Sequence, residues 1–510
     1  MRYLLLALLL VGCSDDTAKK SSASNNFTTQ TDAGTDQGQG DANVVIPPGC
    51  GDGMLATTEV CDGQEVPSTC GELNRGTGEL KCLDTCVFDV SGCEIAASCG
   101  APACHEGAVI TCDASGAVVE TACEDRTACN AGTCIDVCAA AELAQGHEGC
   151  FFMGAQFRNS QGGPGSAFLV QNASPFIATV DFKNETSGET QQARLQSGDL
   201  TVFEIEEDLA VISISSDTPV SAYQVNAPGN ISSQDSSLLL PKHLWGTKSF
   251  VSTWDDSGFM AVLSDVANSA TTTSHGGSAI PAKTMWFLEE PALAGTEVTT
   301  TAPALVFGGD ACTPVITAYC DHLESVMFPS QLLGVHHVVG PYFEGETNVP
   351  QGIQIVGSVD GTSVEVEGDS PQTFTLAAGE AKTLEYEDGI TGVEITASAP
   401  VQVTQFIGAG RSPSMTVIPA ETLWRTEYDA IGLPDATGTF QIIAPANADV
   451  TVNGIALTAF EPVDANYKIA QVEIPEMVQA KIIASEPVQV VVYGFESYAS
   501  YMHLAGLKVR

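Results

Sequence analysis

The histidines are the first residues to search for chemistry, because histidine serves as general base and as metal ligand. The chain has eight of them, and none lies in an H-E-x-x-H pattern. His336 and His337 form an adjacent pair, but neighbouring strand residues face opposite sides, so they are not expected to share a metal. His275 lies in a Gly/Ser-rich run without an identifiable partner. G-x-S-x-G and P-loop motifs are absent too, so the sequence predicts no catalytic residue, metal or cofactor, and a protein that is not an enzyme.

The carboxylates dominate the charge of the chain. There are 63 Asp plus Glu against 19 Lys plus Arg, a formal net charge of −44. This balance argues against nucleic acid as a partner and against a polybasic membrane patch, since both require clustered cations. A glycosidase-like carboxylate pair stays open as an alternative, although no pattern singles one out.

The cysteines indicate disulfides rather than metal sites. Fifteen of the 17 lie in the first 150 residues, and without Cys13 the total is even. A first module, 50–97, contains the disulfide candidates Cys50, Cys61, Cys70, Cys82, Cys86 and Cys93. A second module, 98–150, contains Cys99, Cys104, Cys112, Cys123, Cys129, Cys134, Cys138 and Cys150, whose pairing the sequence does not fix. Dense, even cysteines in a small exported module are typical of disulfide frameworks. Zinc on Cys82 and Cys86 with Cys93 or Cys99 is the weaker alternative, because C-x2-C pairs are missing.

Cys312 and Cys320, the two cysteines outside these modules and the lipobox, are expected to form a disulfide that closes a short loop.

The first residues read as an export signal. Arg2 precedes an apolar run too short to span a bilayer. Leu10-Val11-Gly12-Cys13 resembles a bacterial lipobox, which implies removal of residues 1–12 and lipidation of Cys13. Ser14 then favours the outer membrane of a Gram-negative bacterium, with the protein facing the surface or the periplasm. Residues 13–49 contain few large apolar side chains after Cys13, so we expect a lipid-bearing, disordered tether.

Residues 151–510 must form the scaffold, and their pattern predicts an all-β array. Short runs of Val, Ile, Thr and aromatic residues alternate with polar residues between Gly, Asn, Asp and Pro clusters. An apolar–Pro–Leu/Trp phrase recurs at Pro241, Pro329 and Pro419, at spacings of 88 and 90 residues. The period predicts about four tandem β-sandwich-like units, near 151–240, 241–328, 329–418 and 419–510. An eight-bladed propeller is the rival arrangement.

Two features of this array suggest local roles. A Pro-Val phrase recurs at Pro219, Pro400 and Pro487, and we expect it to begin a strand, where proline is tolerated. The Leu/Trp pair of the other phrase is expected to plug one unit against the next. The four tryptophans are therefore interpreted as core or junction residues rather than as a shelf for sugars: Trp245, Trp254, Trp286 and Trp424.

The run Ser216–Gln224, followed by Asp235–Pro241 and Leu244-Trp245-Gly246, resembles the N-terminal domain of the IgGFc-binding protein family. The departure from the family pattern is at Lys248-Ser249-Phe250. The first cysteine-rich module opens with CGDG at Cys50, continues with CDG at Cys61 and has a C-x3-C-x-FD run from Cys82, and in these features it resembles repeats of secreted myxobacterial proteins. The resemblance implies an extracellular, non-enzymatic module that binds a glycoprotein, a glycan or a matrix component. The immunoglobulin Fc ligand of the family name does not transfer automatically to a chain with a lipobox. A passive structural lipoprotein of the envelope and a hydrolase with an unrecognised acidic cleft are the alternatives, and the oligomeric state is left open.

Overall fold

The structure is a computed structural model. It describes residues 77–78, 81–82, 88–89, 93–94, 102–105, 108–112, 118–160, 165–226, 233–254, 258–316, 319–409, 412–433, 437–474, 479–495 and 499–509. The predicted signal and tether, Cys13, and four cysteines of the first module lie outside these residues: Cys50, Cys61, Cys70 and Cys86. Cys82 takes part in a disulfide, so it is not available to the alternative zinc site. Cys93 begins the two-residue strand β4 (Cys93–Glu94).

The chain divides into two compact units, and the smaller one contains the cysteine-rich residues up to Cys134. Strands β5 (Ala103–His105), β6 (Ala108–Cys112) and β7 (Val118–Ala122) form a three-stranded antiparallel sheet. Disulfides join Cys104 to Cys129 and Cys123 to Cys134. These covalent links stabilise a sheet whose outer strand β7 buries no side chain.

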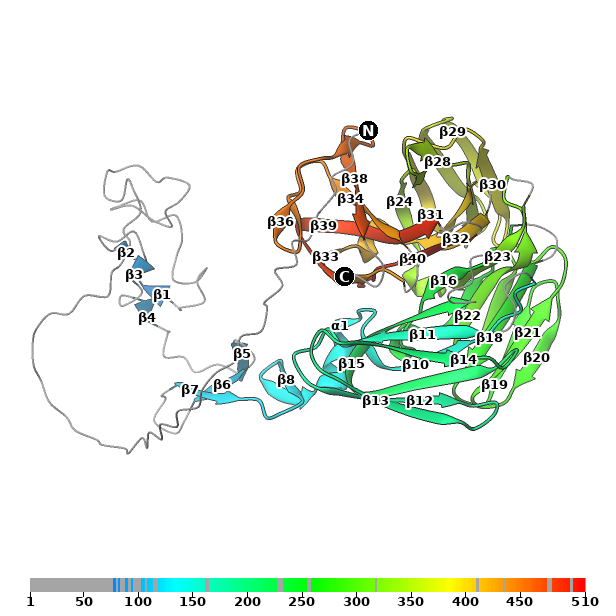
Figure 1. The fold of residues 1–510 in the computed structure, drawn as a ribbon. Helices are drawn as coiled ribbons and strands as arrows, with labels where there is room; N and C mark the ends of the chain where they lie inside the picture. The colour runs from blue at the N-terminus through cyan, green and yellow to red at the C-terminus, as the bar shows by residue number, and fades with distance from the viewer. Residues whose placement is uncertain are drawn as a thin grey trace, which may run out of the picture. The chain divides into compact units, whose positions relative to one another are not determined.

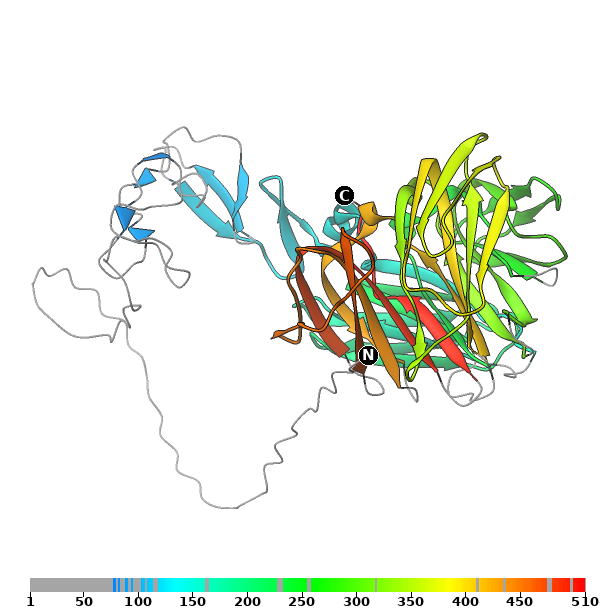
Figure 2. The same ribbon diagram turned by 90° about the horizontal axis from the view of Figure 1, so that it is seen from above.

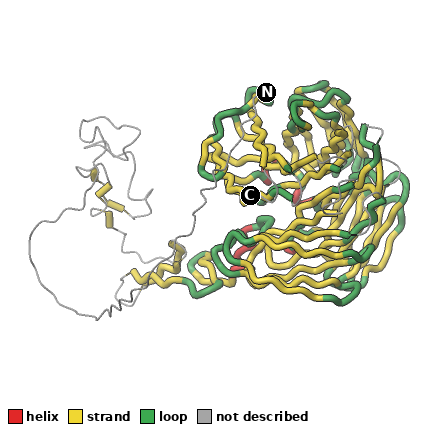
Figure 3. Tube along the Cα trace, in the orientation of Figure 1, coloured by secondary structure: helices red, strands yellow, loops and turns green. Residues whose placement is uncertain are grey.

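The larger compact unit comprises Asp125–Thr127 and the chain from Ile135 onward. Its helix α1 (Val137–Ala144) is the only α-helix among the described residues, and strands make up most of the rest of this unit (Figure 3). Asp136 caps this helix by accepting hydrogen bonds from the backbone N–H groups of Cys138 and Ala139. A disulfide between Cys138 and Cys150 ties the helix to the first strand of the array.

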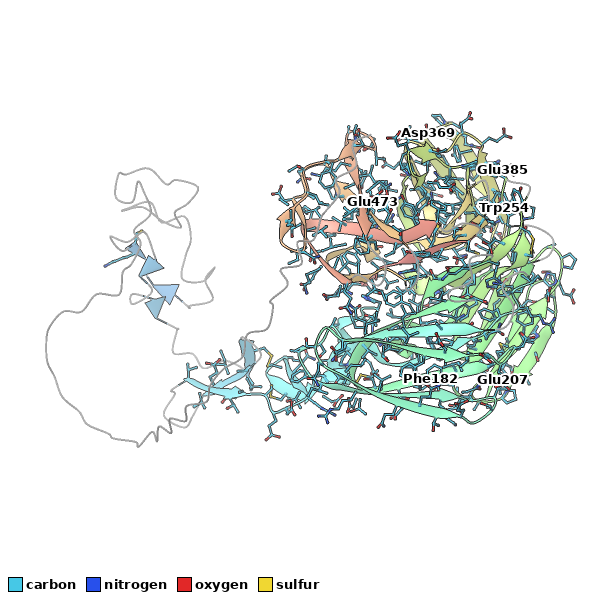
Figure 4. All side chains as sticks on the ribbon, in the orientation of Figure 1. Phe182, Glu207, Trp254, Asp369, Glu385 and Glu473 are labelled. Carbon is cyan, nitrogen blue, oxygen red and sulfur yellow. A yellow bond between two sulfur atoms is a disulfide. The ribbon has the colours of Figure 1, made fainter. Side chains whose placement is uncertain are left out.

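The first sandwich is made from seven described strands. They are β10 (Gly149–Ala155), β11 (Ser166–Gln171), β12 (Ala178–Asn184), β13 (Thr190–Leu195), β14 (Leu200–Ile205), β15 (Val211–Asn226) and β16 (Asp235–Leu238). The first half of β15 pairs with β10 and β12, and its second half pairs with β11 and β16. The alternation of polar and apolar residues places Val180 and Phe182 inside. Phe182, labelled in Figure 4, stacks on Phe203 with ring centroids 4.7 Å apart.

Proline marks the point at which the long strand changes sheets. Pro219 lies inside β15, between the residues that pair in the first sheet and those that pair in the second. Pro400 and Pro487 lie in the same way inside β31 and β39. The expectation that Pro-Val begins a strand is therefore wrong. The proline has no N–H to donate, and this crossover is where the ladder hydrogen bond is not needed.

The other three sandwiches repeat this plan. The second has β17 (Gly246–Phe250), β18 (Gly258–Ser264), β19 (Asn268–Thr272), β20 (Gly277–Ile280), β21 (Thr284–Glu289), β22 (Glu297–Thr313) and β23 (Asp321–Met327). The third has β24 (Gly334–Val339), the hairpin β25 (Phe343–Glu344) and β26 (Thr347–Asn348), β27 (Gln351–Gly357), β28 (Thr362–Gly368), β29 (Gln372–Leu376), β30 (Ala381–Tyr386), β31 (Val393–Ala409) and β32 (Ser412–Ile418). The fourth has β33 (Arg425–Ile431), β34 (Gly438–Pro445), β35 (Val450–Val452), β36 (Ile455–Ala456), β37 (Glu461–Pro462), β38 (Tyr467–Ile474), β39 (Gln479–Phe495) and β40 (Ser500–Leu504). The prediction of an all-β fold of tandem sandwich-like units, preceded by disulfide-bonded segments, is confirmed.

The four sandwiches close into a ring around their last strands. β16 packs on β23, β23 on β32, β32 on β40, and β40 again on β16. These four strands lie together in the middle of the array (Figure 1), and Figure 2 shows the sandwiches around them from above. The repeating element is a whole sandwich of about 88 residues, so the eight-bladed alternative is wrong.

Three junctions between consecutive sandwiches are sealed by short 3-10 helices: η2 (Lys242–Leu244), η3 (Ser330–Leu332) and η4 (Glu421–Leu423). In each, the last residue is a buried leucine, as the predicted plug requires. Strands β17 and β24, which follow the first two of these helices, begin with glycine, and so does β10. A Cβ on Gly149, Gly246 or Gly334 would lie 2.3–2.5 Å from the Cβ of Pro241, Pro329 or Ala420, so these junctions leave no space for a side chain.

Buried glutamines join the third and fourth sandwiches to the first strand of the preceding sandwich. Gln402 donates to the carbonyl of Phe250 at 2.9 Å, and Gln489, in the equivalent Pro-Val-Gln phrase, donates to Val338 at 3.4 Å. Trp254, labelled in Figure 4, packs against Phe406 of the third sandwich with ring centroids 5.1 Å apart. Each of these contacts satisfies or buries groups that one sandwich alone would leave exposed.

Candidate functional site

The carboxylate of Asp235 lies at the centre of the ring. Asp235, the first residue of β16, is fully buried. Its oxygens accept hydrogen bonds from four backbone N–H groups, those of Ser236 at 2.8 Å, Glu324 at 3.0 Å, Met415 at 3.1 Å and Met502 at 3.3 Å. Each donor has the equivalent position in the last strand of its own sandwich. Asp235 therefore connects all four sandwiches through one side chain, and the Ser414 hydroxyl adds a fifth hydrogen bond at 2.5 Å.

A second buried group surrounds Glu324. Its carboxylate accepts from Gln224 at 3.0 Å and Asn226 at 3.2 Å, and it lies 3.0 Å from Nε2 of His322. Glu324 and His322 are both completely buried. Asp321 is a further buried carboxylate, and it accepts a hydrogen bond from the Ser233 hydroxyl of the first sandwich.

Buried carboxylates of this kind are what a hydrolase would require. Burial raises the pKa of Asp235 and of Asp321 well above the usual aspartate range, although hydrogen bonds act in the opposite direction. However, Asp235, Asp321 and Glu324 have no exposed surface, and protein groups occupy the hydrogen-bonding positions described above. A general acid or base must come within hydrogen-bond reach of its substrate. The central carboxylates therefore serve the closure of the ring.

The junction between the fourth and first sandwiches, here called the closing junction, is built differently from the other three. Residues 145–147 meet residues 507–509 through backbone hydrogen bonds, including His147 N–H to Leu507 O at 3.1 Å. Arg425, the first residue of β33, donates through Nη1 to Nδ1 of His147 at 2.6 Å and to Oε1 of Glu148 at 2.7 Å. Since Nδ1 is an acceptor here, the ring proton lies on Nε2, which faces the Ser221 hydroxyl at 3.2 Å.

The ionisation of this group is fixed by its surroundings. Burial, together with the Arg425 charge, outweighs the attraction of Glu148 and lowers the pKa of His147 to about 4. Burial opposes the ionisation of Glu148, but His147 and Arg425 outweigh it and lower the pKa of this carboxyl to about 2. At neutral pH the closing junction therefore contains a neutral imidazole and one carboxylate–guanidinium ion pair.

A pocket of about 310 Å³ opens beside this ion pair. It is lined by Glu148, Ala173, Ser174, Pro219, Arg425, Glu427, Asp429 and Lys481. Lys481 forms ion pairs with Glu427 and with Asp429, the latter at 3.4 Å. The lining contains three carboxylates and two cations, so the pocket is polar and carries a net negative charge.

The structure places the residues that sequence analysis singled out as follows. Cys312 and Cys320 are joined by a disulfide with their Cα atoms 5.1 Å apart. His337 is buried and lies 3.1 Å from the carbonyl of Ile418, whereas His336 faces outward and pairs with Glu394 at 2.7 Å. His275 lies 3.3 Å from the carbonyl of Ala292 and touches none of the groups described above. Within the described residues, no cluster of three or more His, Cys, Asp or Glu side chains could hold a metal ion.

The two tryptophans of the recurring phrase, Trp245 and Trp424, are buried at junctions. The other two, Trp254 and Trp286, are partly buried and pack against the hydrophobic core. Sequence reasoning missed Asp235, the closing-junction ion pair and the pocket. One signal was available for the last two. The phrase Leu-Trp-Gly or Leu-Leu-Gly of two junctions becomes Leu-Trp-Arg at Arg425, which marks a junction that differs from the rest.

The fold and its enclosed polar centre define an all-β scaffold of repeated sandwiches. A family model described as IgGFc binding protein matches residues 235–494, that is 260 of the 510 residues, and begins at the central aspartate. The chain belongs to the IgGFc binding protein family, which is a family of binding proteins. No curated protein matches the chain. Among the described residues, no helix has the length and apolar character needed to cross a membrane.

Proposed function

We propose that this protein is an exported, lipid-anchored recognition protein that binds an extracellular protein without catalysing a reaction. The observation that carries the proposal is the family match over the second, third and fourth sandwiches. It is supported by the ring itself, whose buried carboxylates are engaged in closing the scaffold and so leave recognition to the outer surface.

A protein ligand is favoured over a glycan by the pocket described above. Sugar-binding sites commonly present an aromatic face on which a ring can stack. The lining of the pocket has no aromatic side chain, and five of its eight residues are charged. Charged linings of both signs suit the side chains of another protein.

The localisation is part of the same proposal. Removal of residues 1–12 and acylation of Cys13 would anchor the chain in the outer membrane of a Gram-negative bacterium, facing the surface or the periplasm, with 13–49 as a spacer. Cys13→Ala should abolish labelling with a radioactive fatty acid and release the protein from the membrane fraction. Unchanged labelling and partitioning would rule out this anchor.

Recognition is tested by a binding screen with the complete oxidised chain made soluble by Cys13→Ser. Immobilised immunoglobulin Fc, mucin-type glycoproteins and bacterial exopolysaccharide are the ligands, and heat-unfolded protein is the control. Saturable binding to a protein ligand that survives enzymatic removal of its glycans is the expected result. Binding only to the polysaccharide would favour glycan recognition, and no binding by a folded sample would favour a passive envelope role.

A further inference from the structure

The pocket occupies the place that an apolar plug fills at the other junctions. The residues before β17, β24 and β33 are the pairs Leu244-Trp245, Leu332-Leu333 and Leu423-Trp424. The residues before β10 are His147-Glu148. The closing junction therefore has an imidazole where the others bury leucine, and a carboxylate where two of them bury an indole.

The exchange of an indole for a carboxylate accounts for the space. Trp245 packs edge-on against Phe151 with ring centroids 6.1 Å apart, and Trp424 packs against Tyr467 at 5.8 Å. Phe151 is the third residue of its sandwich's first strand, and Glu427 has the same position in the fourth sandwich. Glu148 is smaller than an indole and is held by Arg425 at 2.7 Å, so it leaves the space in front of Glu427 unfilled.

The fourth sandwich also exchanges the acidic and basic side chains that the second and third place at these positions. Lys248 pairs with Glu297 at 2.8 Å and His336 pairs with Glu394 at 2.7 Å, with the basic group on the first strand. In the fourth sandwich the acid, Glu427, is on the first strand and Lys481 is on the long one. This exchange brings Glu427 to the same opening as Glu148, where the other sandwiches present a basic or aromatic side chain.

The cations of the pocket are already neutralised. Arg425 is held by His147 and Glu148, and Lys481 is held by Glu427 and Asp429. Glu427 is 54% exposed and Asp429 34% exposed, so their oxygens have room for further donors. A carboxylate can accept about four hydrogen bonds. The three carboxylates of the pocket therefore offer more acceptor positions than Arg425 and Lys481 occupy.

We propose that this pocket binds the side chain of a lysine or arginine from the protein ligand. The inference deepens the proposed function and rests on it for the identity of the ligand as a protein. The volume of about 310 Å³ is at the lower limit of ligand pockets, which suits one long side chain rather than a large ligand. The net charge of −44 would draw basic ligands toward the whole molecule.

The test uses small probes, so that it does not depend on the identity of the partner. The complete chain with Cys13→Ser is titrated with N-acetyl-arginine amide and N-acetyl-lysine amide, and ligand-observed NMR measures the binding. N-acetyl-norleucine amide and N-acetyl-glutamate amide are the neutral and anionic comparisons. We expect the two cationic probes to bind at least tenfold more tightly than the other two. Equal binding of all four, or preference for the glutamate probe, would overturn the proposal.

Matched variants locate the binding. Glu427→Gln combined with Asp429→Asn removes two carboxylates from the pocket, and Glu365→Gln combined with Glu385→Gln removes two exposed carboxylates from the third sandwich. The first double variant should weaken binding of the cationic probes at least tenfold, and the second should weaken it less than twofold. Both should keep the melting temperature of the wild type. Equal weakening by both pairs would show general attraction to an acidic surface and would contradict the site. Probe binding at the pocket supports the site even if the screen of protein ligands fails, so the two failures are distinguishable.

Discussion

Asp235 is the single side chain on which closure of the ring most depends, because it accepts one backbone N–H from each of the four sandwiches. Asp235→Asn places an amide N–H2 among these donors and leaves buried N–H groups without an acceptor. We expect a loss of at least about 3 kcal/mol in unfolding free energy. Urea denaturation measures it, with the exposed turn residue variant Asp388→Asn as control. A cost below about 1 kcal/mol would remove Asp235 from this role.

Three of the four buried histidines among the described residues, His147, His337 and His503, make the ring sensitive to acid. Burial is the main cause that lowers the pKa of His147 and His337 to about 4 and that of His503 to about 3. In the unfolded chain these residues take up a proton near pH 6.5, whereas in the folded chain they do so only near pH 4 or below. Stability is therefore complete above about pH 6.5 and is lost as the pH falls toward 4, by up to about 3 kcal/mol for each residue.

The measurement is the unfolding free energy between pH 7 and pH 4 for the wild type and for His337→Gln. The variant should have a slope that is shallower by about 1.4 kcal/mol per pH unit, because one proton fewer is taken up on unfolding. His275→Gln, which removes a partly exposed histidine, is the matched control for the change of residue type. Parallel curves for wild type and His337→Gln would contradict the assignment of a buried neutral imidazole.

Contacts between individual residues were the features that the sequence predicted least well. Asp235 stands in the phrase that carries the family resemblance, but its donors lie 89, 180 and 267 residues further along the chain, apart from Ser236. No local pattern encodes such contacts. His147 likewise meets Arg425, its partner from 278 residues away, only when the ring closes.

At the scale of elements, the alternation of side chains was sufficient to predict strands, because one face of each sheet must be buried. The prolines were misinterpreted because a propensity rule assigns Pro-Val to a strand start. The long strands continue through Pro219, Pro400 and Pro487 because they change sheets there, and the tertiary arrangement removes the need for an N–H.

The closing junction can be converted to the pattern of the others. The triple variant His147→Leu, Glu148→Trp and Arg425→Gly replaces its ion cluster with the plug found at Leu244-Trp245-Gly246. Replacing a buried ion cluster by packed apolar groups is commonly neutral or stabilising by about 1–4 kcal/mol. We expect unchanged or higher stability in urea denaturation, whereas Arg425→Gly alone should destabilise by about 3 kcal/mol because Glu148 loses its partner. A triple variant less stable than Arg425→Gly would contradict the equivalence of the junctions.

The disulfide of the second sandwich is expected to have a local and moderate effect. Cys312 and Cys320 enclose a short loop, with a sequence separation of 8 residues. By loop-closure entropy, Cys312→Ser with Cys320→Ser should cost about 2 kcal/mol, measured by urea denaturation. The matched pair Ser269→Ala with Ser278→Ala, in the same sandwich, should cost less than about 1 kcal/mol. A disulfide contribution near zero would show that the loop is already ordered by its hydrogen bonds.

At the scale of the whole molecule, the period of the sequence predicted four repeated units but not their closure. A period reports how much each unit resembles the next and says nothing of whether the last meets the first. Closure depends on contacts such as His147 with Leu507, separated by 360 residues. The predicted bounds of the tether, the two cysteine-rich modules and the four units stay predictions. A change of composition along the chain does not by itself mark the boundary of a packed domain.

The measurement that tests the closed ring most directly is hydrogen–deuterium exchange of the four central strands. Peptides covering 235–238, 321–327, 412–418 and 500–504 should be strongly and similarly protected in the wild type, because their amides meet at one carboxylate. In Asp235→Asn we predict that all four lose protection together. Loss confined to the peptide 235–238, with the other three unchanged, would contradict a ring closed on Asp235.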